Sequence, residues 1–335
     1  MKLYKKTAAI LAAALVMSSA SAFSAGAVVT VSDGTYQYTY NDGEWGLYAY
    51  LGSDTELTLP ERYGDLPVTS IASRCFSHAG LTSVTIPDSY TQIGSYAFYD
   101  CQNLQDVQFS SSLTTIGMGA FAESGLTAAD LSDTKITAVS DYLFQNCVSL
   151  ENVALPTTLK RLGVASFRNS GVISLHIPEG VTAIDESCFE TGALQTIFLP
   201  ESLESIGASA FRGDNDMTEL YIPENVSDIG AYALYPMSVQ SSLEVQCIED
   251  SYAAQYCYEN FVMDYHTYAH VFGDANLDGS VNVADATQIQ MYCAGYLDFK
   301  QIAQAFADVN DDSRVSVEDV TLIQRYIAGY DDGVF

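Results

Sequence analysis

Hydrophobic residues recur at a regular interval through most of the chain. Between Asp54 and Ser242 a unit of 22 to 24 residues returns, after a longer first unit. Within a unit the segment L-x-S-V-x-I-P alternates apolar and polar positions, which predicts a short strand with one buried face. The proline ends the strand, because it has no N–H for the next hydrogen bond. The clearest units start at Leu81, Leu104, Leu126, Leu150, Val172, Leu194 and Met217.

A phenylalanine closes most units and indicates how they assemble. The segment I-G-x-x-A-F turns back after the strand and directs its ring inward. One unit cannot bury its own apolar face, so neighbouring units must stack into a solenoid with a continuous ladder of rings. Eight strands about 4.8 Å apart give a sheet roughly 34 Å long. The column contains Phe76, Phe98, Phe121, Phe144, Phe167, Phe189 and Phe211, and it ends in Leu234.

The repeat resembles a known family. Its form L-x-x-V-x-I-P-x-x-V-x-x-I-G-x-x-A-F is similar to the BspA-like leucine-rich repeats of bacterial surface and secreted proteins. The resemblance implies an α/β-type leucine-rich-repeat solenoid, rich in short parallel strands, over residues 54–265 including a C-terminal cap. We expect a β-hairpin cap over residues 28–53 that packs Trp45, rather than offering it to a ligand. Residues 266–272 are then a linker.

The last part of the chain contains one sequence twice, as residues 274–296 and 308–330. Each copy opens with oxygen-bearing side chains at positions 1, 3, 5, 9 and 12. This spacing is that of a loop around a calcium ion, to which position 7 adds its backbone carbonyl. The predicted ligands of two Ca²⁺ ions are Asp274, Asn276, Asp278, Ser280, Asn282 and Asp285 in loop one, and Asp308, Asn310, Asp312, Arg314, Ser316 and Asp319 in loop two.

The two loops differ at the sixth position. Gly279 in loop one suits the positive φ of the sharp turn, whereas Ser313 stands there in loop two. A left-handed serine costs about 1 kcal/mol. We therefore expect loop two to be the weaker or less regular site.

The duplicated segment has a loop followed by a helix, and no helical pattern precedes the loop. In this form, with aspartate at position 12, it resembles the type I dockerin domain. The resemblance implies a small all-α module over residues 273–335, folded by calcium, that binds a cohesin module of a cellulosomal scaffoldin. Its helices are expected near residues 284–295 and 318–329, with a bridging helix at 299–306. From the four-residue spacing we expect core pairs of Ile289 with Cys293 and of Ile323 with Ile327.

In dockerins, loop positions 10 and 11 and the exposed helix face select the partner. The positions that match in this chain differ in chemistry between the copies, so the two faces are not expected to be interchangeable. They are Val283, Ala284, Gln290 and Met291 in copy one, and Val317, Glu318, Gln324 and Arg325 in copy two.

Charge and the N-terminus bear on compartment and partners. The chain has 13 basic and 42 acidic residues, a net charge of −29. Such a chain is repelled by nucleic acid and by anionic membranes. Residues 1–27 combine a basic start, an apolar run from Ala8 to Met17 and small residues near the end, which predicts a secretory signal peptide. The run is too short for a membrane anchor, so we expect a secreted, extracellular protein associated with a cellulosome or a cell surface.

The seven cysteines do not have the spacing of a disulfide framework. Most stand at repeat-core positions, where cysteine is typical as a small buried residue. Whether Cys247 and Cys257 pair stays open.

One polar column of the strands belongs to the predicted concave face, where solenoids commonly bind their ligands. Its last three members are the rings of His176, Phe198 and Tyr221. Such rings can stack on a sugar or anchor a protein partner. The alternative interpretation is that exposed strands favour aromatic residues in any case.

Catalytic motifs are missing from the sequence, which contains no G-x-S-x-G, H-E-x-x-H or phosphate-binding loop. Acidic residues on repeats are typical of solvated turns. We therefore expect a non-catalytic protein that docks onto a cohesin and presents its repeats to a protein or glycan. The alternatives are a surface adhesin and a glycoside hydrolase component of the cellulosome.

Overall fold

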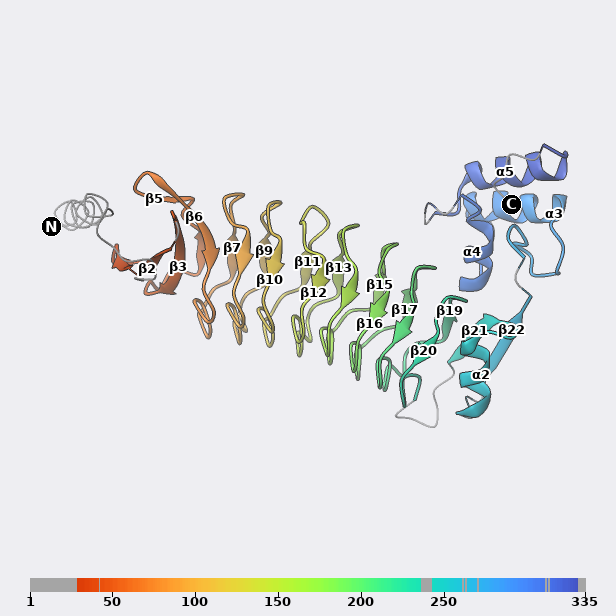
Figure 1. The fold of residues 1–335 in the computed structure, drawn as a ribbon, viewed down its shortest axis with the longest axis horizontal. Coiled ribbons are helices and arrows are strands. Elements are labelled where there is room, and N and C mark those ends of the chain that lie inside the picture. The colour runs from red at the N-terminus through yellow and green to blue at the C-terminus, as the bar shows by residue number, and fades with distance from the viewer. Residues whose placement is uncertain are drawn as a thin grey trace.

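The chain forms a long solenoid that ends in a cluster of helices (Figure 1). The computed structural model describes residues 29–41, 43–235, 243–260, 262, 264–269, 271–310, 312 and 314–330. The expected signal peptide lies outside these residues. Within them, no helix is long and apolar enough to cross a membrane.

An antiparallel meander covers the N-terminal end of the solenoid. It consists of β1 (Val29–Ser32), β2 (Tyr36–Asn41) and β3 (Glu44–Tyr50). Strand β3 then pairs in parallel with β6 (Leu66–Ile71), which also pairs with the short β5 (Arg62–Tyr63). Trp45 is buried among the rings of Tyr38, Tyr40 and Tyr63, as expected for a cap residue.

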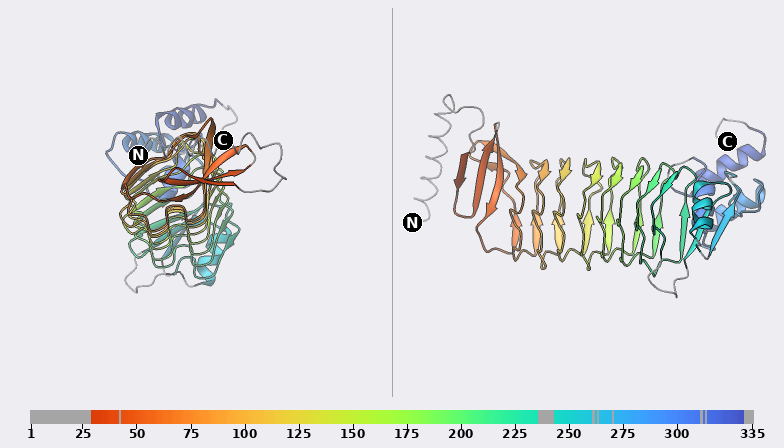
Figure 2. Two further views of the ribbon diagram at one scale, coloured as in Figure 1. Left: turned by 90° about the vertical axis from the view of Figure 1, so that its left-hand side faces the viewer. Right: turned by 60° about the horizontal axis from the view of Figure 1, so that its bottom comes forward.

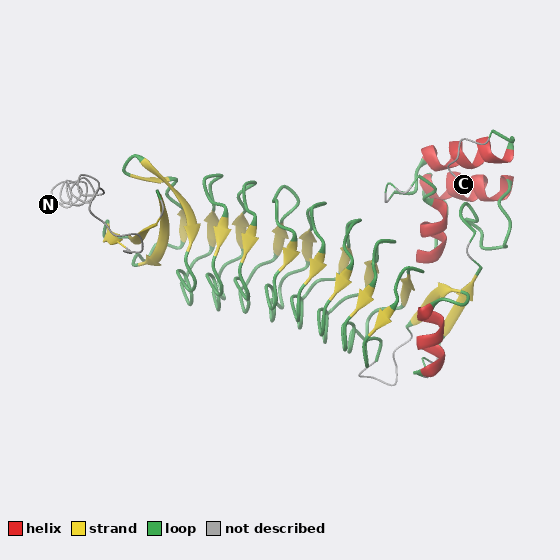
Figure 3. Ribbon diagram, viewed as in Figure 1, coloured by secondary structure: helices red, strands yellow, loops and turns green. Residues whose placement is uncertain are grey.

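Each repeat contributes a short strand to each of two faces (Figure 3). The strands pair in parallel within several short sheets, and the pairing is interrupted between β9 and β11, β13 and β15, and β17 and β19 on the first face and between β10 and β12 on the second. Seen end on, the repeats lie almost on top of one another (Figure 2). The first face contains β4 (Glu56–Thr58), β7 (Ser83–Thr85), β9 (Asp106–Gln108), β11 (Ala128–Asp130), β13 (Asn152–Ala154), β15 (Ser174–His176), β17 (Thr196–Phe198) and β19 (Glu219–Ile222). After β6, the second contains β8 (Gln92–Ile93), β10 (Thr115–Ile116), β12 (Ala138–Val139), β14 (Arg161–Leu162), β16 (Ala183–Ile184), β18 (Ser205–Ile206) and β20 (Asp228–Ile229).

The predicted ladder of phenylalanines forms the core of the solenoid. All seven rings are buried, and consecutive centroids are 4.9 to 6.1 Å apart. Full burial of each ring is worth about 1.5–3 kcal/mol. Four of the seven rings have a glycine four positions before them: Gly94, Gly117, Gly163 and Gly207. These glycines let the repeats approach, since a Cβ at Gly117 would lie 2.4 Å from the backbone nitrogen of Ser95.

The C-terminal end of the solenoid is covered by β21 (Glu244–Ile248), α2 (Tyr252–Glu259) and β22 (Tyr265–Tyr268). The Ser251 hydroxyl caps α2 by accepting the Ala254 N–H, and the Tyr256 hydroxyl donates to the Gly230 carbonyl of the last repeat. Strand β22 pairs in parallel with β21. Residues 266–268 of the expected linker are therefore part of this sheet.

Six of the seven cysteines are buried free thiols, and Cys293 is exposed. Cys101 and Cys147 donate to the carbonyls of Phe76 and Phe121 in the preceding repeats. Burial raises the pKa of Cys101 to about 12, so this thiol is inert at neutral pH. Cys247 and Cys257 form no disulfide, and the hydrogen bond between their thiols raises the pKa of Cys257.

Three helices follow the solenoid: α3 (Val283–Cys293), α4 (Gln301–Ala307) and α5 (Val317–Ile327). Ile289 and Ile323 are fully buried in the core between them, as predicted. The pairing of these residues with Cys293 and Ile327 is wrong, because both partners are exposed, Ile327 to 38%. Cys293 and Ile327 are the last residues of α3 and α5 and lie beyond the core.

Candidate functional site

Loop one is organised around the carboxylate of Asp274. Its Oδ1 accepts the Asp278 N–H at 3.0 Å, and its Oδ2 accepts the Gly279 N–H at 2.7 Å. These bonds close the turn, in which Gly279 has a φ of +84°. Glycine adopts this left-handed conformation without the cost that a Cβ imposes. Gly279 at the sixth position therefore has the left-handed conformation that the sequence predicted for this turn.

Asp285, at position 12, joins loop one to α3. Its two carboxylate oxygens accept the N–H groups of Asn276 and Asn282 at 3.1 and 2.8 Å. The Asn282 side chain in turn accepts the Ala284 N–H at 2.8 Å, and Asn282 and Asp285 together form a capping box. The same residue thus orders the loop and starts the helix.

Loop two repeats this arrangement 34 residues later. Asp308 accepts the Asp312 N–H at 3.2 Å. Asp319 accepts the N–H groups of Val309 and Ser316 at 3.1 and 2.7 Å, and Ser316 and Asp319 form the capping box of α5. Ser313 lies outside the described residues, so the expected weakness of loop two stays a prediction.

The donor set of both loops fits calcium. Every predicted ligand offers oxygen, the donor that calcium prefers. Asp274, Asp285 and Asp319 are buried, and no lysine or arginine of the described chain forms an ion pair with them. Burial raises the pKa of Asp274 and of Asp319. Buried carboxylates need a compensating charge, which a divalent cation in each loop would supply. Across the described residues, the aspartates of the two loops included, no three His, Cys, Asp or Glu side chains are grouped as a metal site.

The positions implied for cohesin recognition are all exposed. Val283 and Val317, at equivalent places in the two copies, are 66% and 65% exposed. Ala284, Gln290, Met291, Glu318, Gln324 and Arg325 are exposed as well. Figure 1 places α4 between the α3–α5 pair and the end of the solenoid. A partner could therefore reach α3 and α5 without displacing the repeats.

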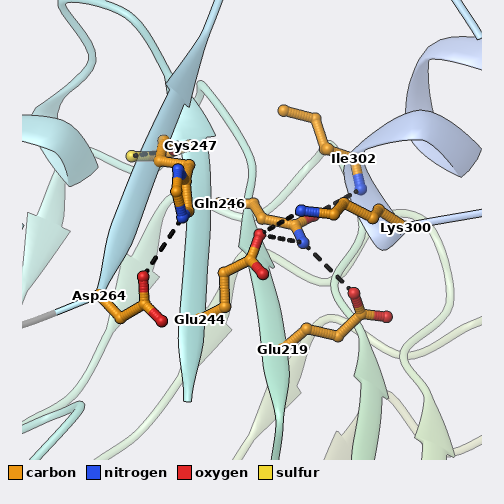
Figure 4. A network of polar contacts seen from close by, with 8 residues as sticks. Glu219, Glu244, Gln246, Cys247, Asp264, Lys300 and Ile302 are labelled. Carbon is orange, nitrogen blue, oxygen red and sulfur yellow. Dashed lines mark hydrogen bonds and ion pairs between the residues drawn. The ribbon is translucent and has the colours of Figure 1, made fainter. Parts of the chain in front are cut away.

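Helix α4 packs the C-terminal helical module onto the solenoid through a polar network around Gln246 (Figure 4). Its N-cap, Lys300, makes no side-chain cap bond. The Ile302 N–H in the first turn instead donates to Oε1 of Gln246 on β21, at 3.1 Å. The Tyr221 N–H on β19 donates to Oε1 of Gln301 at 2.8 Å. Because an unpaired helix-terminal N–H is costly when buried, the solenoid stabilises this helix.

Further contacts hold the Gln246 amide and the helix in place. Gln246 is fully buried, and its Nε2 donates to Glu219 and Glu244 at 3.2 and 3.3 Å. Lys300 pairs with Glu244 at 2.6 Å, and this hydrogen bond raises the pKa of Lys300. Ile302 and Phe306 of α4 are buried in a small cluster with Tyr221 and Ile248. The expected bridging helix is thus also the joint between the modules.

The three rings predicted as a ligand face lie side by side, but with different exposure. His176 and Phe198 are paired residues of β15 and β17, with ring centroids 5.8 Å apart. The prediction that Tyr221 is an exposed ring is wrong, because α4 covers it and leaves it 5% exposed. Its hydroxyl bonds to Glu201, and burial raises its pKa.

Sequence reasoning missed the joint residues Gln246, Gln301 and Ile302. Two glutamines 55 positions apart carry no pattern that would join them. The one available signal was the apolar pair Ile302 and Phe306, spaced four apart on a short helix. An apolar stripe on such a helix needs a surface to cover it.

Comparisons with known proteins give two families. The family model of the BspA type leucine rich repeat region matches six copies, over residues 69–192 and 137–261. The model of the dockerin type I domain matches residues 272–328. No curated protein matches the chain.

Several solved structures are similar to this chain. The leucine rich repeat protein TpLRR of T. pallidum is 20% identical, with 70% of this chain and 97% of that one covered and a TM-score of 0.45. A leucine rich cell surface protein of Faecalibacterium prausnitzii is 20% identical, with a TM-score of 0.41. The match covers 77% of this chain and 100% of that one. The chain belongs to the BspA-type leucine-rich-repeat proteins and carries a C-terminal type I dockerin domain.

Proposed function

We propose that this protein is a secreted, non-catalytic component of a cellulosome-type assembly. Its dockerin, folded by two calcium ions, binds a cohesin of a scaffoldin, and its solenoid then presents a binding surface to a protein or glycan. The observation that carries this proposal is the dockerin itself: two oxygen-lined loops lead into helices whose recognition positions are exposed. A dockerin is a calcium-binding domain that implies a cohesin partner.

The absence of catalysis is part of the proposal. Leucine-rich repeats and dockerins are non-catalytic domain types, and together they occupy most of the chain. A glycoside hydrolase would need a pair of carboxylates facing a sugar-binding cleft. A surface adhesin remains compatible with docking and differs in the ligand of its repeats.

Calorimetric titration of the whole protein against a panel of cohesins, in calcium and in chelator, tests the docking. We expect binding in calcium and its loss in chelator, because the loops order the helices. Binding that survives chelation, or no binding to any cohesin of the panel, would contradict the proposal.

The two recognition faces should contribute unequally. Met291→Ala removes an apolar contact from copy one, whereas Arg325→Ala removes a charge from copy two. We expect the cohesin affinities of the two variants to differ by roughly tenfold, or about 1.4 kcal/mol. Tyr48→Ala, in the distant N-terminal cap, is the control. Equal small effects would indicate interchangeable faces.

A further inference from the structure

A cleft of about 490 Å³ lies where the solenoid meets the dockerin. Its solenoid side contains His176, Phe198 and, at its covered edge, Tyr221. Tyr292 and Arg314 line the dockerin side. Small-molecule and oligosaccharide sites are commonly of this size and commonly lie between domains. The cleft is thus a composite that neither module forms alone.

The cleft combines flat rings with hydrogen-bonding groups. His176 and Phe198 form a pair of adjacent rings on the paired strands β15 and β17. Desolvation lowers the pKa of His176, so its ring is uncharged at neutral pH. Across from it, the Tyr292 ring stacks on Phe299 with centroids 4.7 Å apart, which holds it in place. Gln304 and the exposed guanidinium of Arg314 add polar groups. Rings beside polar groups suit the apolar faces and hydroxyls of a sugar.

The carboxylates of the cleft are engaged within the protein. Glu179 accepts the N–H groups of Glu201 and Ser202 at 3.0 and 3.3 Å. Glu201 bonds to the Tyr221 hydroxyl. Asp308 is the first ligand of calcium loop two. These carboxylates are therefore poorly placed to bind a basic peptide, while the net charge of −29 repels acidic polysaccharides.

We propose that this cleft binds a neutral oligosaccharide, with the solenoid and the dockerin each supplying one wall. The proposal rests on the proposed function and names the ligand class and place of its binding surface. Because loop two contributes Asp308 and Arg314, the complete cleft exists only while calcium keeps the dockerin folded. Sugar binding is accordingly calcium-dependent although no sugar need contact the ion.

The test titrates the full chain with cellohexaose, xylohexaose and mannohexaose, and with polygalacturonate and a lysine-rich peptide for comparison. We expect at least one neutral oligosaccharide to bind in calcium and none in chelator. Phe198→Ala removes a ring of the solenoid wall. Arg314→Ala removes a side chain of the dockerin wall and keeps the backbone carbonyl at position 7. Each should weaken binding tenfold or more, whereas Tyr48→Ala leaves it unchanged.

The proposal is overturned if no neutral oligosaccharide of the panel binds, or if the peptide or polygalacturonate binds instead. Equal sugar affinity of wild type, Phe198→Ala and Arg314→Ala, or undiminished binding in chelator, also overturns it. Circular dichroism of each variant checks that it folds. Cohesin affinity is measured on the same samples, so a protein that binds cohesin but no sugar retains the docking function and loses this inference.

Discussion

The solenoid and the dockerin are stabilised by different means. The solenoid has one continuous apolar core, which runs from Tyr36 in the N-terminal cap to Cys257 in the C-terminal cap. Among the described residues, the dockerin core contains nine buried apolar side chains, and the carboxylates of Asp274, Asp285 and Asp319 are buried as well. Stacked repeats hold themselves together, whereas a module that buries charge depends on a counter-charge.

The difference also explains how the two regions are joined. An apolar joint would have sufficed to bury Ile302 and Phe306, but the contact with the solenoid adds the amides of Gln246 and Gln301. Buried amides must find their partners, so they fix the register of the contact more narrowly than apolar packing does. The solenoid thus orients the small module as well as carrying it.

The largest effect is expected from the double variant Asp285→Ala/Asp319→Ala. It removes position 12 from both loops and the carboxylates that complete both capping boxes. We expect calcium affinity to fall on the order of 100-fold or more, with loss of the helical signal of the dockerin. Calcium titration followed by circular dichroism measures both. Asp298→Ala, at an exposed non-ligand position, is the control; an unchanged titration in the double variant would show that these loops do not hold the ion.

Replacing a ring in the middle of the ladder should damage the solenoid alone. Phe144 stacks on Phe121 and Phe167 and is fully buried. Phe144→Ala leaves a cavity and costs about 3–5 kcal/mol. Urea unfolding of the repeats measures this loss, while calcium affinity stays as in the wild type. Val148→Ala, at an exposed position of the same repeat, should cost little, and a similar loss in both variants would argue against the ladder.

The joint itself can be weakened by Gln246→Leu. This change leaves the Ile302 N–H buried without its acceptor, at a cost of about 1–3 kcal/mol. We expect the dockerin to detach in part, seen by small-angle X-ray scattering as a larger maximum dimension. Gln108→Leu, at an exposed position of β9 in an early repeat, should leave the scattering curve unchanged. An undisturbed curve for Gln246→Leu would mean that apolar contacts alone hold the joint.

The smallest effect concerns the sixth position of the loops. Gly279→Ser places a Cβ at a φ of +84° and should cost about 1 kcal/mol, a fivefold loss of calcium affinity. The reverse change Ser313→Gly should tighten loop two by a similar factor. Calcium titration of both variants measures the change in affinity. Tighter binding by Gly279→Ser, or weaker binding by Ser313→Gly, would contradict the account.

The sequence predicted those features that repeat. The phenylalanine column and the duplicated loops each recur at fixed spacing, so each copy supports the others, and Ile289 and Ile323 lie in the core as expected. The sequence failed where one residue meets another only once. Tyr221 is covered by a helix 80 residues further on, at a contact made by polar side chains without any period. A repeated pattern can be recognised from a short stretch of sequence. The surface on which a module docks cannot be recognised in this way, because that contact occurs only once in the chain.

Hydrogen exchange of the whole chain, in calcium and in chelator, tests the contrast between the two regions most directly. The account predicts that the amides of α3 and α5 are protected in calcium and exchange freely in chelator. The amides of Phe98 and Phe121, which bond to the next repeat, should stay protected in both. Protection of α3 and α5 that survives chelation, or loss of protection along the ladder, would contradict it.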